Sequence, residues 1–315
     1  MKVLVTGAGG FIGSQLVKLL RDRGRIGEER IAALAVADRT LSDVPSGAFA
    51  LEGDLGSASV LQRIAHFDPT VVFHLAAVPG GAAEADYELG RRANLDATLA
   101  LFERLADRER PPVVVYASSI AVYGTDLPDV VTPTAPLRPP LTYGAHKLAC
   151  EILLADFSRR GLLDGRSIRL PGIVARPREP SGLASAFMSD LLHAMRAGER
   201  FTCPVSRGAT AWWMSATRCA ENLVHASTMD VSSADPARAW PLPVLRMSIG
   251  EVIATCAAIF GDDRKGLVTF EPSEKLEAVF GRYPPLDDEA SRALGLQDDG
   301  SAEALIVRAT DHHRR

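Results

Sequence analysis

The chain has 315 residues, a formal net charge of −4 at pH 7, 47% hydrophobic residues and 23% charged residues. This length allows one large domain or two closely associated domains with a sizeable core, and this charge offers no electrostatic case for nucleic acid or an anionic membrane as a partner. No run approaches the ~20 apolar residues of a membrane span, and the apolar run at the N-terminus meets glycines too early for a signal peptide. The four cysteines are far apart in the sequence, which favours free thiols in a reducing compartment. We therefore expect a cytoplasmic protein.

Short apolar runs alternate with longer helical stretches through the first half of the chain. Strands are expected at residues 2–7, 31–39, 70–78, 112–119 and 166–174. Helices are expected at residues 11–24, 59–67 and 94–108 and around Tyr143. This alternation is typical of βαβ units, whose buried parallel strands read as continuous apolar runs. We therefore predict an α/β fold with a doubly wound parallel sheet of the Rossmann type.

The regular rhythm ends near residue 175, where the sequence ARPREPSG begins. We predict a sheet domain at residues 1–175 and a smaller, irregular, substrate-binding subdomain at residues 176–315. A segment near residues 208–250, which includes a further helix at 219–229, is expected to pack back on the sheet domain. The final residues DHHRR, at 311–315, are expected to be a frayed end and not a metal site.

The first predicted strand runs directly into GAGGFIG, with Gly7, Gly10 and Gly13 at three-residue spacing. Glycine is required where the turn takes a positive φ, where backbone approaches a pyrophosphate and where the helix packs closely on the strand. The N-terminus of the following helix then offers N–H groups and a positive dipole to phosphates. A glycine-rich turn without a ligand is the alternative, but the position between strand and helix favours dinucleotide binding.

The second predicted strand ends in Asp38. A carboxylate there can accept both adenosine ribose hydroxyls and repels a 2′-phosphate, which favours NAD over NADP. Arg39 weakens this preference because an arginine there can instead meet a 2′-phosphate. Asp54 has two interpretations, contact with the adenine edge and a helix cap.

Tyr143 stands four residues before Lys147, so on a helix both side chains lie on one face. An ammonium beside the phenol favours the phenolate and lowers a pKa that is ordinarily about 10. This spacing also arises by chance in helices that carry a core ring and a solvated lysine. His146 turns to a different part of the face, and nothing requires a second base.

Six motifs occur together in one order: TGAGGFIGS, GDL, VFHLAAV, NLDAT, ASSIAVYG and YGAHK. In this order and spacing the chain resembles the extended short-chain dehydrogenase/reductase family, which includes nucleotide-sugar epimerases and dehydratases. The resemblance implies that Ser119, Tyr143 and Lys147 are the catalytic residues and that NAD is the cofactor. It implies a cofactor site made of Gly7, Gly10, Phe11, Ile12, Gly13, Asp38, Asp54, Leu55, Leu75, Ala76, Ala77, Asn94, Ser118, Tyr143, Lys147, Pro171 and Ile173.

The chemistry explains why these residue types are needed. A hydride can leave a carbinol carbon only as the hydroxyl proton is removed, so a phenolate near that oxygen is a suitable base. Ser119 would orient the substrate oxygen, and Lys147 would make Tyr143 acidic and reach the nicotinamide ribose. Asn94 is either a residue near the active site or a satisfied amide of the core.

The substrate must be inferred from departures from the family pattern. The 4,6-dehydratases have an acidic pair after the catalytic serine or threonine, whereas this chain has Ile120 and Ala121. Nucleotide-sugar members usually have an arginine-aspartate-aromatic segment before a late helix and an asparagine after the sixth strand, which help to hold the nucleotide diphosphate. The corresponding residues here, 209–226 and 168–177, lack that segment and that asparagine respectively. These departures argue against dehydration and indicate a smaller substrate.

Longer stretches, at residues 74–98, 157–177, 203–205 and 214–226, resemble the family members that oxidise four-carbon sugar acids. This resemblance implies NAD-dependent oxidation of D-erythronate to 2-dehydro-D-erythronate. Arg176 could bind the carboxylate bidentately or be a surface arginine in a proline-rich loop. Ser185 and Trp212 are weaker pocket candidates, since they could equally be a helix cap and a core filler.

Two alternatives remain at this point: a nucleotide-sugar 4-epimerase of the same family, and a non-catalytic NAD-binding sensor. The sensor is disfavoured because the chain keeps the tyrosine. Family members often dimerise through a four-helix bundle, so the resemblance implies a homodimer formed by the helices at 94–108 and 143–160.

Overall fold

The computed structural model describes residues 1–108, 110–178, 185–232 and 234–311. The predicted frayed end falls mostly on residues 312–315, which lie outside this part of the chain. No helix in the described ranges is both long and apolar enough to cross a membrane. Those ranges also contain no group of three or more His, Cys, Asp or Glu side chains placed to hold a metal ion.

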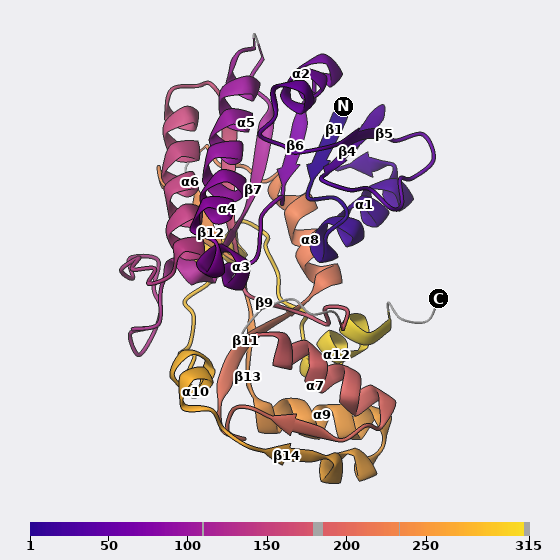
Figure 1. Ribbon diagram of the computed structural model, residues 1–315, viewed down its shortest axis with the longest axis vertical. Coiled ribbons are helices and arrows are strands. Elements are labelled where there is room, and N and C mark those ends of the chain that lie inside the picture. Colours follow the sequence, from indigo (N-terminus) through magenta and orange to yellow (C-terminus); the bar gives the residue numbers. More distant parts are fainter. Residues whose placement is uncertain (109, 179–184, 233, 312–315) are drawn as a thin grey trace.

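A seven-stranded sheet forms the centre of the larger part of the molecule (Figure 1). Its order is β12-β8-β7-β6-β1-β4-β5, and every neighbouring pair is parallel. The strands are β1 (Lys2–Thr6), β4 (Ala33–Asp38), β5 (Phe49–Glu52), β6 (Val71–His74), β7 (Val113–Ser119), β8 (Asp164–Leu170) and β12 (Ala239–Pro241). From β1 the chain proceeds to β4 on one side and to β6 on the other, so the predicted doubly wound fold is confirmed. Ligands bind such sheets at the carboxyl ends of the strands where the order reverses.

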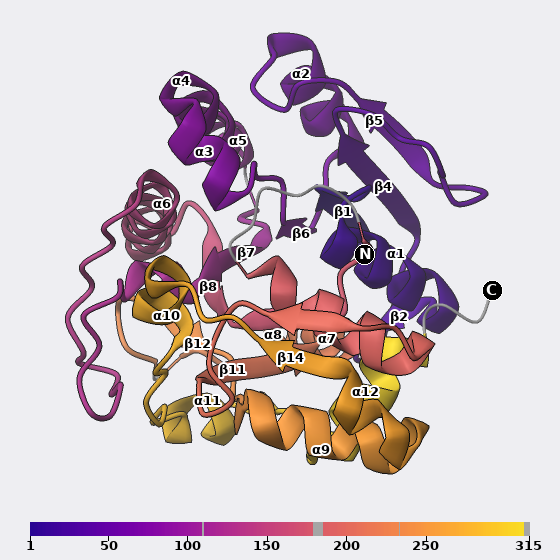
Figure 2. The ribbon, with the colours of Figure 1, turned by 60° about the horizontal axis from the view of Figure 1, so that its bottom comes forward.

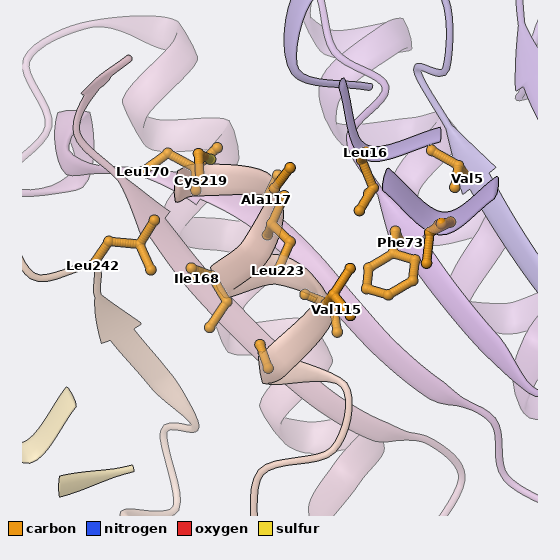
Figure 3. Close-up of a cluster of buried hydrophobic side chains, with 14 of the residues drawn as sticks. Val5, Leu16, Phe73, Val115, Ala117, Ile168, Leu170, Cys219, Leu223 and Leu242 are labelled. Atoms are coloured by element: carbon orange, nitrogen blue, oxygen red, sulfur yellow. The ribbon is translucent and has the colours of Figure 1, made fainter. Parts of the chain in front are cut away.

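Helices cover both faces of this sheet. Two cover one face, α1 (Phe11–Arg23) and α8 (Ala216–Ala226), and their apolar residues join Val5, Phe73 and Val115 in one core (Figure 3). The opposite face is covered by α2 (Ala58–Phe67), α5 (Ala97–Ala106) and α6 (Thr142–Arg159). Burial on both faces explains why the central strands are apolar throughout.

The smaller part of the molecule lies beyond the carboxyl ends of the sheet (Figure 2). Its three-stranded sheet consists of β13 (Leu245–Ser248), β11 (Thr210–Ser215) and β9 (Gly172–Val174). Its core includes residues of α7 (Ala186–Ala197), α9 (Ile249–Phe260) and α12 (Ala302–Asp311). Of the segment expected to pack back on the first domain, α8 and β12 lie against the large sheet, whereas β11 and β13 belong to the small one.

Shorter elements complete the described chain. They are β2 (Arg25–Ile26), β3 (Glu29–Arg30), α3 (Gly80–Ala85), α4 (Tyr87–Arg91), the π-helical turn η1 (Arg92–Asp96), the 3-10 turn η2 (Ile120–Val122), β10 (Phe201–Cys203), the 3-10 turn η3 (Asp262–Leu267), β14 (Val268–Phe270), α10 (Glu274–Phe280) and α11 (Glu289–Ala293).

In the large sheet, one predicted strand ends early and the edge strand β5 was not expected. The single strand expected at residues 166–174 breaks at Pro171 into β8 and β9, because proline has no N–H to donate to a ladder. The second half then leaves the large sheet and pairs with β11. Strand β5 was not predicted: it is a four-residue edge strand with one buried residue, Leu51, and so carries little hydrophobic pattern.

Candidate active site

The glycine loop between β1 and α1 has the tight geometry that its sequence predicts. Gly7 has a φ of 69°, and a Cβ atom on it would lie 2.6 Å from the backbone nitrogen of Ala76. A Cβ on Gly13 would lie 2.0 Å from the carbonyl oxygen of Gly7. Gly10 precedes α1 without a side-chain cap, and Phe11 and Ile12 form its first turn. The N–H groups of that turn are therefore open to an anion, which fits the pyrophosphate of a dinucleotide.

Asp38 lies at the carboxyl end of β4, beside this loop. Its Oδ2 accepts a hydrogen bond from Gly9 N at 2.9 Å, and its Oδ1 accepts one from Arg39 N at 2.7 Å. A small cavity opens next to it, lined by Thr6, Ala37, Asp38, Arg39, Gly53, Leu55, Val60 and Ala76. The cavity lies where the adenosine half of a dinucleotide is expected, at the carboxyl edge of the sheet and beside the acid expected to meet the ribose.

Asp54 does not cap the helix that follows it. Its Oδ1 accepts a hydrogen bond from Gly56 N at 2.9 Å, while Ser57 caps α2 by accepting from Val60 N. The cap interpretation therefore applies to Ser57, and Asp54 shapes the turn before it.

The segment after β6 is held by Asn94. Leu75, Ala76 and Ala77 lie in this segment, and Ala76 N donates to Thr6 Oγ1 at 3.3 Å. The amide of Asn94 accepts from Val78 N at 2.8 Å and donates to Val78 O at 3.1 Å. Both polar ends of this buried amide are thus satisfied within the protein. Asn94 lies in the π-helical turn η1, a local distortion frequently found at functional sites.

Ser119, Tyr143 and Lys147 come from two neighbouring elements. Ser119 ends β7 and its Oγ accepts from Ala121 N at 3.1 Å, while Tyr143 and Lys147 lie on one face of α6. The Ser119 hydroxyl is also near enough to Tyr143 for its hydrogen bonding to lower the pKa of the phenol. The structure therefore brings together the three residues that the family resemblance named.

The pKa of Tyr143 reflects opposing influences. Burial raises it above its ordinary value, whereas the hydrogen bond from Ser119 and the positive charge of Arg176 lower it. We predicted that Lys147 has the lowering role. Its ammonium lies 5.6 Å from the centroid of the Tyr143 ring, but Ser119 and Arg176 are the groups that favour the phenolate in the structure.

Lys147 is buried and contacts two residues of β7. Its Nζ donates to Ala117 O at 2.7 Å and lies 4.7 Å from the centroid of the Tyr116 ring. Burial lowers the pKa of Lys147 to about 8, against the opposing effect of Glu151 and Cys150. The ammonium is thus fixed in place and close to losing its charge slightly above neutral pH.

A buried ion pair behind these residues was not predicted. Arg169 Nη2 on β8 lies 2.8 Å from Glu151 Oε2 on α6, and Ser118 donates to the same carboxylate. A sequence signal existed: Glu151 follows Lys147 by four residues, and Arg169 interrupts an apolar strand. Charges at such positions are seldom buried unless they are paired.

The segment after β8 carries Pro171, Ile173 and then Arg176 toward the glycine loop. The Cζ atom of Arg176 lies 5.0 Å from the centroid of the Phe11 ring. Arg176 and Tyr143 also influence each other's pKa by charge. The half-buried guanidinium forms no ion pair with any carboxylate in the described residues. Arg176 is therefore a cation between the cofactor loop and the candidate base.

The two weaker pocket candidates lie differently. Ser185 stands at the position before α7, but its side chain makes no capping hydrogen bond. Trp212 is 1% exposed, donates from Nε1 to Pro284 O at 2.7 Å and packs edge-on against Tyr123. Trp212 is thus a core residue, as its alternative interpretation stated.

Comparisons with known proteins show the family of the chain. A model of the NAD dependent epimerase/dehydratase family matches residues 3–232. A D-erythronate dehydrogenase of Cupriavidus necator is 37% identical over 314 residues, which cover 97% of each chain. A D-erythronate dehydrogenase of Haemophilus influenzae is 29% identical over 317 residues, which cover 99% of each chain. The solved structure of a nucleoside-diphosphate-sugar epimerase from Agrobacterium tumefaciens superposes with a TM-score of 0.92 at 32% identity, covering 99% of this chain and 94% of that one.

Proposed function

Because the chain belongs to the NAD-dependent epimerase/dehydratase family, we propose that it oxidises a small sugar acid, D-erythronate, to 2-dehydro-D-erythronate. The observation that carries this proposal is the position of Arg176. A half-buried guanidinium without a carboxylate partner in the described residues is costly, and the carboxylate of a bound acid would offset that cost. Two relatives that match over almost their full length are D-erythronate dehydrogenases, which supports the same substrate.

A carboxylate bound to Arg176 would also determine which hydroxyl is oxidised. The charge of Arg176 acts on Tyr143 directly, so a carboxylate bound by Arg176 would place the neighbouring carbon near the phenol. Oxidation at C2 follows, because the hydroxyl on that carbon is the one nearest to the carboxylate. Tyr143 takes the proton of this hydroxyl, and Ser119 donates a hydrogen bond that holds the oxygen in place.

Bound NAD would supply the hydride acceptor for the oxidation at C2. The residues that would hold it are the glycine loop, Asp38 and the cavity beside it, and the segment after β6 that Asn94 fixes. Lys147, whose ammonium lies 5.6 Å from the centroid of the Tyr143 ring, would hold the nicotinamide ribose. The hydroxyl at C2 becomes a carbonyl, which is a two-electron oxidation that releases the hydroxyl proton.

The residues of strand β11 support a small substrate. Nucleotide-sugar members resemble one another in having an arginine, an aspartate and an aromatic residue there, whereas this chain has Trp212 and Trp213, both buried. Indoles that are packed in the core cannot bind a nucleotide diphosphate.

The second candidate is a nucleotide-sugar 4-epimerase. It is favoured by the match to the Agrobacterium tumefaciens protein described as a nucleoside-diphosphate-sugar epimerase. Such an enzyme would turn over UDP- or dTDP-sugars without net release of NADH.

One experiment distinguishes these functions. Purified protein is incubated with NAD or NADP and a panel of C4 and C5 sugar acids, and absorbance at 340 nm is followed. We expect steady NADH formation with D-erythronate and none in Tyr143→Phe. Failure across the panel, together with tight binding of a UDP-sugar by calorimetry, would establish the epimerase. NAD binding with neither activity would establish a sensor.

We also propose a cytoplasmic homodimer. The four cysteines are free and buried, which suits a reducing compartment. Helices α5 and α6 are the expected dimer surface, and Ile152 on α6 is 63% exposed. Light scattering at micromolar concentration should report a dimer that Ile152→Glu weakens, and a monomeric parent chain would contradict this.

A further inference from the structure

Buried polar side chains lie directly behind the catalytic residues and have no part in the chemistry described so far. Glu151 and Arg169 are at their centre, with side chains 4% and 7% exposed. Besides the contact from Nη2, Arg169 Nε donates to Glu151 Oε1 at 3.0 Å. A buried pair with two such bonds holds α6 and β8 in one relative position.

Each member of the pair bonds the side chain of a residue that lies near Ser119 in the chain. Ser118, the preceding residue, donates its hydroxyl to Glu151. Arg169 Nη1 donates to the hydroxyl of Tyr123 at 3.1 Å, and Tyr123 closes the η2 turn that Ser119 begins. The pair therefore fixes the chain on both sides of the residue that orients the substrate oxygen.

The pair also faces Lys147. Glu151 lies one helical turn beyond Lys147 on α6, where side chains four residues apart are neighbours. The other titratable groups around Lys147 are Tyr143 and Cys150 on α6, His74 on β6 and Tyr116 on β7. Among these groups Glu151 supplies the carboxylate, and its negative charge favours the ammonium form.

We propose that Glu151 and Arg169 are positioning residues for the oxidation, holding Ser119 through its neighbours and keeping Lys147 charged beside Tyr143. The effect on turnover rests on the proposed function, whereas the effect on Lys147 can be measured without substrate. Neither residue needs to touch the substrate.

The test must separate positioning from stability. Replacing Glu151 alone leaves the charge of Arg169 buried and unpaired, which destabilises a protein strongly, whereas replacing both partners by apolar residues is often neutral. The double variant Glu151→Met with Arg169→Met is therefore used. We expect its unfolding free energy to be near that of the parent chain, while kcat with D-erythronate falls about 100-fold, as for other displaced catalytic groups.

A matched control lies on the same strand. Arg166 on β8 is 5% exposed and its Nη2 lies 2.8 Å from Asp164 Oδ2. It donates to the carbonyl oxygens of Ala226 and Ser227, away from Ser119. Arg166→Met is expected to cost stability while leaving kcat unchanged.

The second readout is the titration of Lys147 in protein without substrate or cofactor. The chain has five lysines, at positions 2, 18, 147, 265 and 275, so NMR of ¹³C-labelled lysine resolves the buried one. The double variant should titrate Lys147 at lower pH than the parent, and Arg166→Met should not.

A stable double variant with parental kcat and parental Lys147 titration would overturn the proposal. If the double variant does not fold, Arg169→Lys is tested instead, because a lysine cannot bond both Glu151 and Tyr123 as a guanidinium does. We expect this variant to lower kcat about tenfold. A parental kcat in Arg169→Lys would also overturn the proposal. If the parent chain oxidises no sugar acid, the proposed function fails. The NMR titration then tests by itself whether Glu151 and Arg169 keep Lys147 charged.

Discussion

The guanidinium of Arg176 stacks on the ring of Phe11, with 5.0 Å between its Cζ atom and the ring centroid. Phe11 is the first residue of α1 after the glycine loop, and Arg176 follows the segment where the chain leaves the large sheet for the small one. The contact places one cation at the start of the cofactor helix, and the charge of Arg176 also lowers the pKa of Tyr143. A substrate carboxylate bound there would have its neighbouring hydroxyl at the base.

Arg176→Gln should lower kcat/KM for D-erythronate by about 10- to 100-fold, because a hydrogen bond to a charged group contributes about 1.5–3 kcal/mol. The loss should be specific to acids: any slow oxidation of erythritol, the polyol without a carboxylate, should be unaffected. Initial rates at 340 nm with both compounds measure this ratio.

Arg178→Gln is the matched control for this prediction. Arg178 lies two residues further on, is exposed and pairs with Glu199 at 2.6 Å. Its replacement should leave kcat/KM for the acid unchanged. Equal losses in both variants, or equal losses for acid and polyol, would show that Arg176 does not bind the carboxylate.

Gly13→Ala should weaken NAD binding by at least about tenfold, equivalent to about 1.4 kcal/mol. The new methyl group would lie 2.0 Å from Gly7 O, so the loop must move away from the position that receives the pyrophosphate. Calorimetry with NAD measures the change, and Gly208→Ala is the control because its methyl group would have no neighbour within 4 Å. Unchanged NAD affinity in Gly13→Ala would refute the role given to this loop.

Asn94→Ala should cost about 1–3 kcal/mol of unfolding free energy, because it leaves the buried N–H and C=O of Val78 without partners. It should also raise the Kd of NAD by shifting the segment that carries Ala76. Asn222 makes the same two bonds with the backbone of Gln297, far along the chain. Asn222→Ala should lose similar stability in urea yet bind NAD normally, and weakened NAD binding in both variants would reduce Asn94 to a core residue.

His74 should make the protein sensitive to acid. The ring is fully buried, bonded to Thr6 and Thr98, and burial together with the charge of Lys147 lowers the pKa of His74 from 6.5 to about 3. Between these values the unfolded chain binds a proton that the folded chain does not, so stability falls as the pH falls from 6.5 toward 3 by about 1.4 kcal/mol per unit.

Urea unfolding at several pH values between 7 and 4 tests this. His74→Gln should be less stable than the parent at pH 7, and the difference should shrink as the pH falls. The exposed His66→Gln should follow the parent throughout. A difference between His74→Gln and the parent that stays constant with pH would contradict the assignment.

Much of the fold follows from local sequence. Buried parallel strands are apolar on both faces, so β1, β4, β6 and β7 could be predicted from composition alone. The break at Pro171 was visible as a proline, but the departure of β9 to another sheet depends on β11, almost 40 residues later. Edge strand β5 buries one residue and has almost no pattern to detect.

The site divides in the same way. Ser119, Tyr143 and Lys147 could be named from the family resemblance of the motifs that contain them, and a strand end and one helix face bring them together. Glu151 and Arg169 could not, since a charge in an apolar stretch becomes informative only when its partner on another element is known. The tuning of Tyr143 by Arg176 was missed for that reason, as it joins residues 33 positions apart through tertiary packing.

The most direct test of the central claim uses D-erythronate that carries deuterium at C2. The account predicts that NAD is reduced with deuterium transferred to the nicotinamide, that 2-dehydro-D-erythronate accumulates in equal amount, and that Tyr143→Phe abolishes both. Mass spectrometry of the reduced cofactor and of the acid measures the transfer. Reduced cofactor without deuterium would contradict oxidation at C2. If NAD is not reduced and the protein instead turns over a UDP-sugar, the proposed dehydrogenase activity is contradicted.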